Sequence, residues 1–91
     1  MENPILSNPA NTLEFPGVTQ EQLAKLLDLA RKNGAVVTVQ DPNMGAITYH
    51  HWIWHVQAVY MLSPLGLTVQ VDGHAAEVRS EITKELARIT G

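Results

Sequence analysis

The stretch of residues 47–62, ITYHHWIWHVQAVYML, constrains the fold more than any other part of the chain. It holds four of the five aromatic residues and three of the four histidines. It also lies within a longer span, residues 42–71, that contains no Asp, Glu, Lys or Arg. Such an apolar, uncharged span is typical of buried structure or of a binding surface. We therefore expect it either in the core or at an interface.

Two secondary structures fit this stretch. Its Ile, Thr, Tyr, Trp and Val content favours a β-strand, in which Trp52 and Trp54 would share one face. A helix beginning near His50 would instead align a stripe of Trp52, Ile53, Val56, Val59 and Tyr60. The whole stretch of sixteen residues is long for one strand. We therefore interpret only its first half, residues 47–54, as the central strand. Residues 57–62 either continue as a bent strand or turn helical.

The segment before this stretch predicts a helix and a strand. Thr19 with Gln22 forms a capping-box pattern, and Gly34 can end the helix in a left-handed conformation. The buried stripe of this helix would contain Leu23, Leu26, Leu27 and Ala30. Residues 35–40 then read as a strand, and the turn residues at 41–45 predict a hairpin into the central stretch.

The segment after it predicts a turn, a strand and a second helix. Ser63 to Gly66 has turn composition, and residues 67–71 alternate in the manner of a strand. Asp72 is the expected cap of the last helix, whose stripe would contain Ala75, Val78, Ile82, Leu86 and Ile89. Glu81 with Lys84, and Glu85 with Arg88, would pair on its solvent side.

These elements predict an α+β fold with a three-stranded antiparallel sheet, flanked by N- and C-terminal amphipathic helices. A ferredoxin-like βαββαβ order with an extra C-terminal helix is the alternative if residues 50–62 are helical. Residues 1–17 contain three prolines and three asparagines and are expected to form an extended arm, in which residues 12–15 could make a short edge strand. Residues 18–91 would form the single domain.

Composition argues against several functional classes. The net charge is −3 and the six basic residues form no large basic field, so a nucleic-acid partner is not expected. The chain has no cysteine for disulfides, thiolate zinc sites or cysteine nucleophiles. We find no signal-peptide pattern and no apolar run long enough for a membrane span. The expectation is a cytoplasmic protein that does not bind membranes.

His51 and His55 are the candidate metal ligands. On a helix they stand at i and i+4 and could chelate zinc, copper or nickel. On a strand they would stand about 13 Å apart, which is too far for one ion. No acidic residue lies in the stretch to complete a metal site, so no cofactor is expected. A protein that binds a metal or a small ligand through the histidines is kept as an alternative.

The sequence favours a non-catalytic protein. It contains no nucleophile elbow, phosphate loop or dinucleotide-binding motif, and no family signature. Two helices can cover only one face of the sheet, which would leave an uncharged face with tryptophans for a partner. We therefore predict a homodimer or a complex with another protein, with a compact inhibitor or decoy of an enzyme as an alternative. The expected contact residues are Thr48, His50, Trp52, Trp54 and Tyr60.

Overall fold

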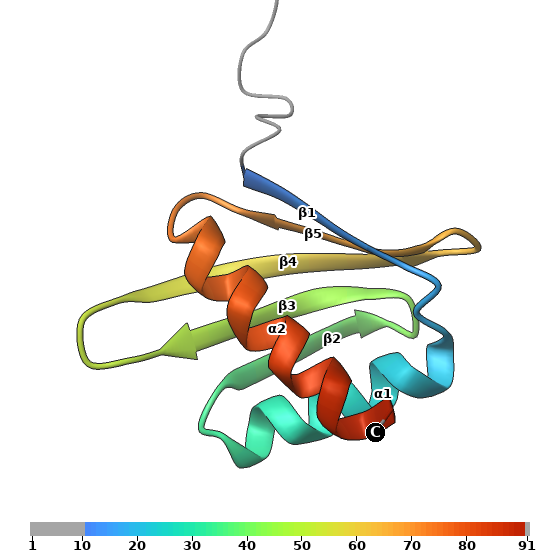
Figure 1. Cartoon of the computed structure of the whole chain (residues 1–91), viewed down its shortest axis with the longest axis horizontal. Coiled ribbons are helices and arrows are strands. Elements are labelled where there is room, and N and C mark those ends of the chain that lie inside the picture. The colour runs from blue at the N-terminus through green and yellow to red at the C-terminus, as the bar shows by residue number, and fades with distance from the viewer. Residues whose placement is uncertain (1–10, 91) are drawn as a thin grey trace, which may run out of the picture.

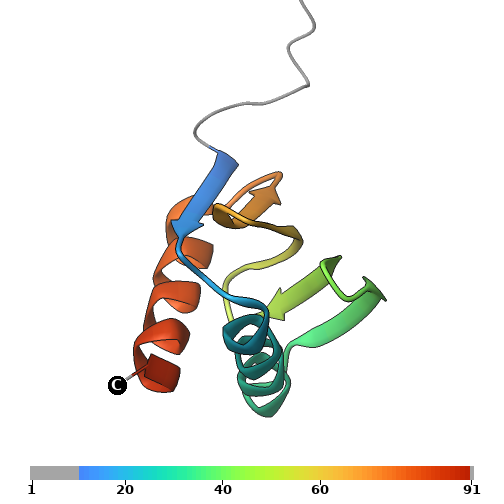
Figure 2. The ribbon, with the colours of Figure 1, turned by 90° about the vertical axis from the view of Figure 1, so that its right-hand side faces the viewer.

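The computed structural model of the chain describes residues 11–90. They form one antiparallel sheet of five strands in the order β1-β5-β4-β3-β2, together with two helices. Both helices lie on the same side of the sheet and contact each other (Figures 1 and 2). The elements in chain order are β1 (Thr12–Pro16), α1 (Gln20–Lys32), β2 (Val36–Asp41), β3 (Met44–His50), β4 (His55–Ser63), β5 (Gly66–Val71) and α2 (Ala75–Thr90).

The α+β class is confirmed, but the three-stranded sheet is wrong. The central stretch is not one strand, because the chain reverses between β3 and β4, where the His51 N–H donates to the Trp54 carbonyl at 2.8 Å. This turn contains none of the Gly, Pro, Asn or Asp residues that are typical of turns in a sequence. The ferredoxin-like alternative is also wrong, because residues 55–63 are a strand and not a helix.

The predicted N-terminal arm contains the fifth strand. Thr12–Pro16 pairs with β5 along its whole length, from Thr12 opposite Gln70 to Pro16 opposite Gly66. Leu13 and Phe15 are buried against the helices, so this edge strand is part of the core. Residues 1–10, the rest of the predicted arm, lie outside the described residues.

Helix α1 forms as its sequence predicts. Thr19 Oγ1 accepts a hydrogen bond from the Gln22 backbone at 3.1 Å, and Gln22 Oε1 accepts one from the Thr19 backbone at 3.0 Å. These two bonds satisfy N–H groups that a helix N-terminus leaves without partners. The predicted stripe of Leu23, Leu26, Leu27 and Ala30 is buried.

Helix α2 differs from its prediction in two places. It begins at Ala75, and His74, with a positive φ of 54°, accepts the hydrogen bond from the Val78 N–H. The expected cap, Asp72, therefore lies before the helix start. Val78 and Ile82 are fully buried as predicted, but Glu85 is also buried, with 2% of its surface exposed. The expected position of Glu85 on the solvent side is wrong.

A close contact between β3 and β4 lies in the core. Gly45 and Tyr60 are opposite each other in the register, and the Tyr60 ring fills the space where a larger residue would have its side chain. A Cβ at Gly45 would overlap the Tyr60 ring and the Thr38 carbonyl. Gly45 therefore allows a large aromatic ring to be buried in a thin core.

Neither helix in residues 11–90 has the length and apolar content needed to cross a membrane.

Candidate functional site

The face of the sheet opposite the helices has no covering element among the described residues (Figure 2). We call it the open face. Its side chains alternate with the core residues along each strand. The register places two acidic residues on this side, both on edge strands: Glu14 on β1 and, after a register shift, Asp41 opposite Met44 at the end of β2. The open face contains Thr12, Glu14, Val36, Thr38, Asp41, Met44, Ala46, Thr48, His50, His55, Gln57, Val59, Met61, Thr68 and Gln70.

Apolar side chains lie at the centre of the open face. Val59 and Met61 of β4 are about half exposed, and they stand beside Ala46 and Met44 of β3 in the register. Threonines and glutamines surround this centre on β2, β3, β4 and β5. An apolar centre with a neutral polar margin is the composition expected of a protein interface.

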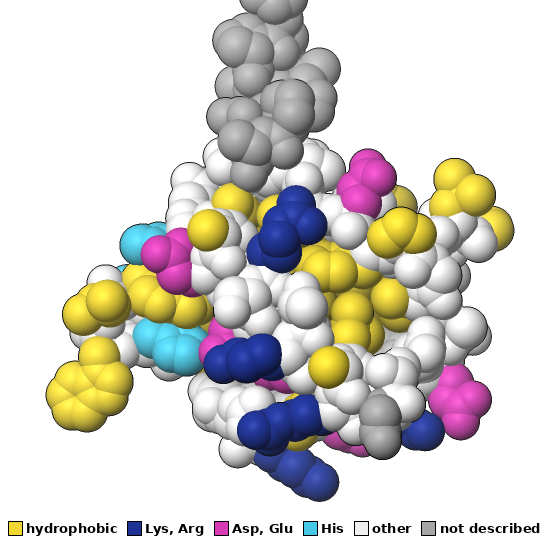
Figure 3. All heavy atoms as spheres, in the orientation of Figure 1, with side chains coloured by type: hydrophobic (Ala, Val, Ile, Leu, Met, Phe, Trp, Pro, Cys, Tyr) yellow, Lys and Arg dark blue, Asp and Glu magenta, His cyan; other side chains and the backbone are white. Residues whose placement is uncertain are grey.

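The turn between β3 and β4 extends this surface beyond the sheet. Trp52 is fully exposed and Ile53 is 89% exposed. Figure 3 shows hydrophobic side chains protruding at this end of the molecule, while Lys and Arg side chains gather over the helices. Two large apolar side chains in water at one turn mark a candidate contact site.

Trp54 lies elsewhere and has a different role. Its indole ring stacks on His51 with centroids 4.3 Å apart and on His74 at 5.5 Å, and it also packs against the buried core. It therefore joins the turn to the segment before α2. Trp54 is not on the open face, contrary to the expectation for a continuous strand in which it shared a face with Trp52.

The structure brings together only some of the predicted contact residues. Thr48 and His50 lie on the open face, and Trp52 lies at the adjoining turn. Tyr60 is 1% exposed and belongs to the core, so it cannot be a contact residue.

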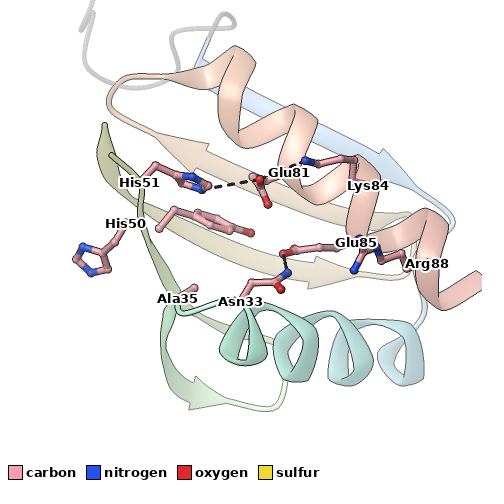
Figure 4. Close-up of a pocket in the computed structure, with 9 residues that line it drawn as sticks. Asn33, Ala35, His50, His51, Glu81, Lys84, Glu85 and Arg88 are labelled. Carbon is pink, nitrogen blue, oxygen red and sulfur yellow. Dashed lines mark hydrogen bonds and ion pairs between the residues drawn. The ribbon is translucent and has the colours of Figure 1, made fainter. Parts of the chain in front are cut away.

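The histidines divide between the two sides of the sheet. His50 and His55 are opposite each other in the register, and their rings stack at 5.8 Å. His51 instead points towards α2, where its Nε2 lies 3.8 Å from Glu81 Oε2 (Figure 4). The structure therefore does not bring His51 and His55 together as a chelating pair. Within residues 11–90, no group of three or more His, Cys, Asp or Glu residues could hold a metal ion.

A second candidate site is a cavity of about 240 Å³ on the helix side of the sheet. It lies between the end of α1, the end of β3 and the middle of α2 (Figure 4). Its polar lining includes Asn33, Tyr49, His51, Glu81 and Glu85, with Lys84 and Arg88 at the exposed margin. The cavity therefore combines buried oxygen atoms with cationic side chains at its rim.

Two oxygen atoms of this cavity lack partners. Asn33 Nδ2 donates to Glu85 Oε2 at 3.2 Å, but among the described residues neither Glu85 Oε1 nor the Tyr49 hydroxyl has a hydrogen-bond partner of good geometry. Burial raises the pKa of the Glu85 carboxyl, although the hydrogen bond from Asn33 opposes this shift. Burial, followed by the charges of Glu85 and Glu81 and by a weak hydrogen-bond interaction with Glu85, also raises the pKa of the Tyr49 phenol.

Sequence reasoning missed this cavity because it assigned Glu85 to solvent by its pairing with Arg88. Glu85 stands seven residues after Val78 and three after Ile82, so helical spacing alone places it on the buried stripe. That spacing was the available signal. An acidic residue at such a position is unusual enough to suggest a special environment.

Comparison with known proteins identifies no relative, since no family model, curated protein or solved structure matches the chain.

Proposed function

We propose that this chain is a small, non-catalytic, cytoplasmic interaction domain that forms a homodimer through the open face and the adjoining Trp52–Ile53 turn. The observation that carries the proposal is the exposure of Trp52 and Ile53 next to an open face whose charged residues, Glu14 and Asp41, lie only on the two edge strands. Exposed tryptophan is costly to leave in water and is enriched among the residues that dominate binding energies.

The charge pattern favours a second copy of the chain as the partner. A two-fold interface places the same patch on both subunits, so any strong charge there would face its own copy. The open face limits this repulsion, because its two acidic residues, Glu14 and Asp41, lie on the two edge strands and no Lys or Arg is present on that face. A foreign partner chosen by charge would instead need a field of opposite sign, which this face does not offer.

Sedimentation velocity of three proteins tests the proposal. We expect the wild type to sediment as a dimer near neutral pH and Trp52→Ala to shift towards the monomer. Leu65→Ala is the matched control, because Leu65 is also 85% exposed but lies in the turn between β4 and β5, at the other end of β4. A wild type that remains monomeric, or a folded Trp52→Ala variant with unchanged mass, would refute the proposed interface.

A further inference from the structure

The carboxylate of Glu85 has no cation beside it. None of the ion pairs among the described residues includes Glu85. Its neighbour Glu81 is paired instead, with Lys84 at 3.5 Å and with His51 at 3.8 Å. Arg88 lines the same cavity but forms no ion pair with Glu85. A carboxylate that is 98% buried without a cation is costly, unless it is neutralised or a ligand supplies the charge.

We propose that the cavity binds a primary alkylammonium group, with Glu85 Oε1 as its counter-ion and the Tyr49 hydroxyl as a second oxygen partner. Both oxygens are deeply buried and line the cavity, and neither has a hydrogen bond of good geometry among the described residues, although Tyr49 and Glu85 lie close enough to influence each other's pKa. The site lies on the helix side of the sheet, so this inference does not depend on dimerisation through the open face.

The free acceptors favour an ammonium over the other common charged groups. Glu85 Oε2 already accepts from Asn33, so a guanidinium that forms two parallel bonds with the carboxylate would have to share this oxygen with Asn33. An ammonium is a compact donor that can use single oxygens. A carboxylate or phosphate ligand would meet the charge of Glu85 and could reach cations only at the rim.

Binding should depend on pH because the carboxylate must be ionised. Burial raises the pKa of Glu85 in the free protein, and an ammonium ligand would lower it again. The other titratable groups that line the cavity are Tyr49 and His50 from β3, His51 from the turn, and Glu81, Lys84 and Arg88 from α2, while the end of α1 contributes the neutral Asn33. Ammonium binding therefore releases a proton from Glu85 wherever the free carboxyl is partly protonated.

Chemical-shift titration of the ¹⁵N-labelled protein with n-butylammonium chloride tests the proposal. We expect saturable shifts at residues lining the cavity, and no saturation with sodium butyrate, which has the opposite charge. A blocked Gly-Lys-Gly peptide forms a second arm: saturation with it shows that a lysine side chain can supply the group, and saturation with butylammonium alone assigns the site to a free amine. Failure of both ammonium probes to saturate would overturn the proposal.

Variants separate this site from general attraction to an acidic protein. Glu85→Gln keeps the size of the side chain and should weaken butylammonium binding at least about tenfold, because a charge-assisted bond is lost. Glu21→Gln removes the same charge from the exposed surface of α1 and should leave binding unchanged. Equal losses in the two variants would show non-specific attraction and contradict the proposal.

Two more measurements keep the proposal testable if Glu85→Gln does not fold. Arg88→Gln removes a rim cation and should tighten ammonium binding, whereas weaker binding would indicate an anion site instead. Calorimetry of the wild type in two buffers of different ionisation enthalpy, repeated at several pH values above 4.5, should show proton release on binding where the free Glu85 carboxyl is partly protonated. Binding without proton release at any pH where the free carboxyl is partly protonated would exclude Glu85 as the counter-ion.

Discussion

The two faces of the sheet are built from alternate residues of the same strands, and within residues 42–71 they lack charge for different reasons. On the covered face, Ile47, Val69 and their neighbours are buried under the helices, where an unpaired charge would be costly. On the open face, Val59 and Met61 are half exposed, and nothing within residues 11–90 requires their surroundings to be uncharged. Burial in the monomer therefore explains only half of the uncharged span, and an interface is our explanation for the other half.

The largest expected difference between the faces is in stability. Ile82 of α2 is fully buried, and Ile82→Ala should lower the free energy of unfolding by about 2–5 kcal/mol, because it removes packed methyl groups and leaves a cavity. Val59→Ala on the open face should change the monomer by no more than about 0.5 kcal/mol. Urea unfolding at protein concentrations low enough to favour the monomer measures both. Equal losses would mean that the open face is packed in the monomer.

A second substitution adds volume to the covered face instead of removing it. Gly45→Ala should destabilise the protein by about 1–3 kcal/mol, because the new methyl group would overlap the Tyr60 ring and the Thr38 carbonyl. Gly73→Ala is the control, since a Cβ there would meet no atom within 4 Å. Thermal unfolding of the two variants compares them. A Gly45→Ala protein as stable as Gly73→Ala would show that β3 and β4 can separate freely at this point.

The smallest effect is a pH dependence on the covered face. The folded pKa of Glu85 is raised above its ordinary value of 4.5, so the folded state holds this proton at pH values where the unfolded state has lost it. The contribution of Glu85 to stability is therefore greatest below the unfolded pKa and is lost as pH rises through the folded pKa. As pH falls through the raised folded pKa towards 4.5, wild-type stability should rise relative to that of Glu85→Gln.

Chemical unfolding of both proteins at several pH values gives this difference directly. Subtracting the two curves cancels groups that titrate alike in both proteins. A difference that is flat, or that falls towards acid, would show that burial does not raise the pKa of Glu85.

Local patterns predicted the parts of the fold that depend on neighbouring residues. The capping box at Thr19, the buried stripe of α1, and the hairpin at residues 41–45 each depend on a few adjacent side chains. Alternation also placed Thr48 and His50 on the uncovered face of the sheet, where the structure has them.

Features that depend on tertiary contacts could not be predicted in this way. The turn at residues 51–54 is joined to the rest of the fold by stacking of Trp54 on His51 and His74, and its own composition resembles a strand. Because the chain turns between β3 and β4, the residues of β4 face the opposite sides from those expected for one continuous strand. Val56 therefore lies in the core and not on the open face. The cavity at Glu85 joins α1, β3 and α2, which no single segment of sequence brings together.

The contact between Gly45 and Tyr60 has a consequence for how sequences with this fold can diverge. The Tyr60 ring fills the space that a side chain at position 45 would occupy, so the two positions share one fixed volume. A side chain gained at position 45 would have to be matched by a smaller one at position 60. We expect the two positions to change together in relatives of this chain, and a set of relatives in which they vary independently would contradict this.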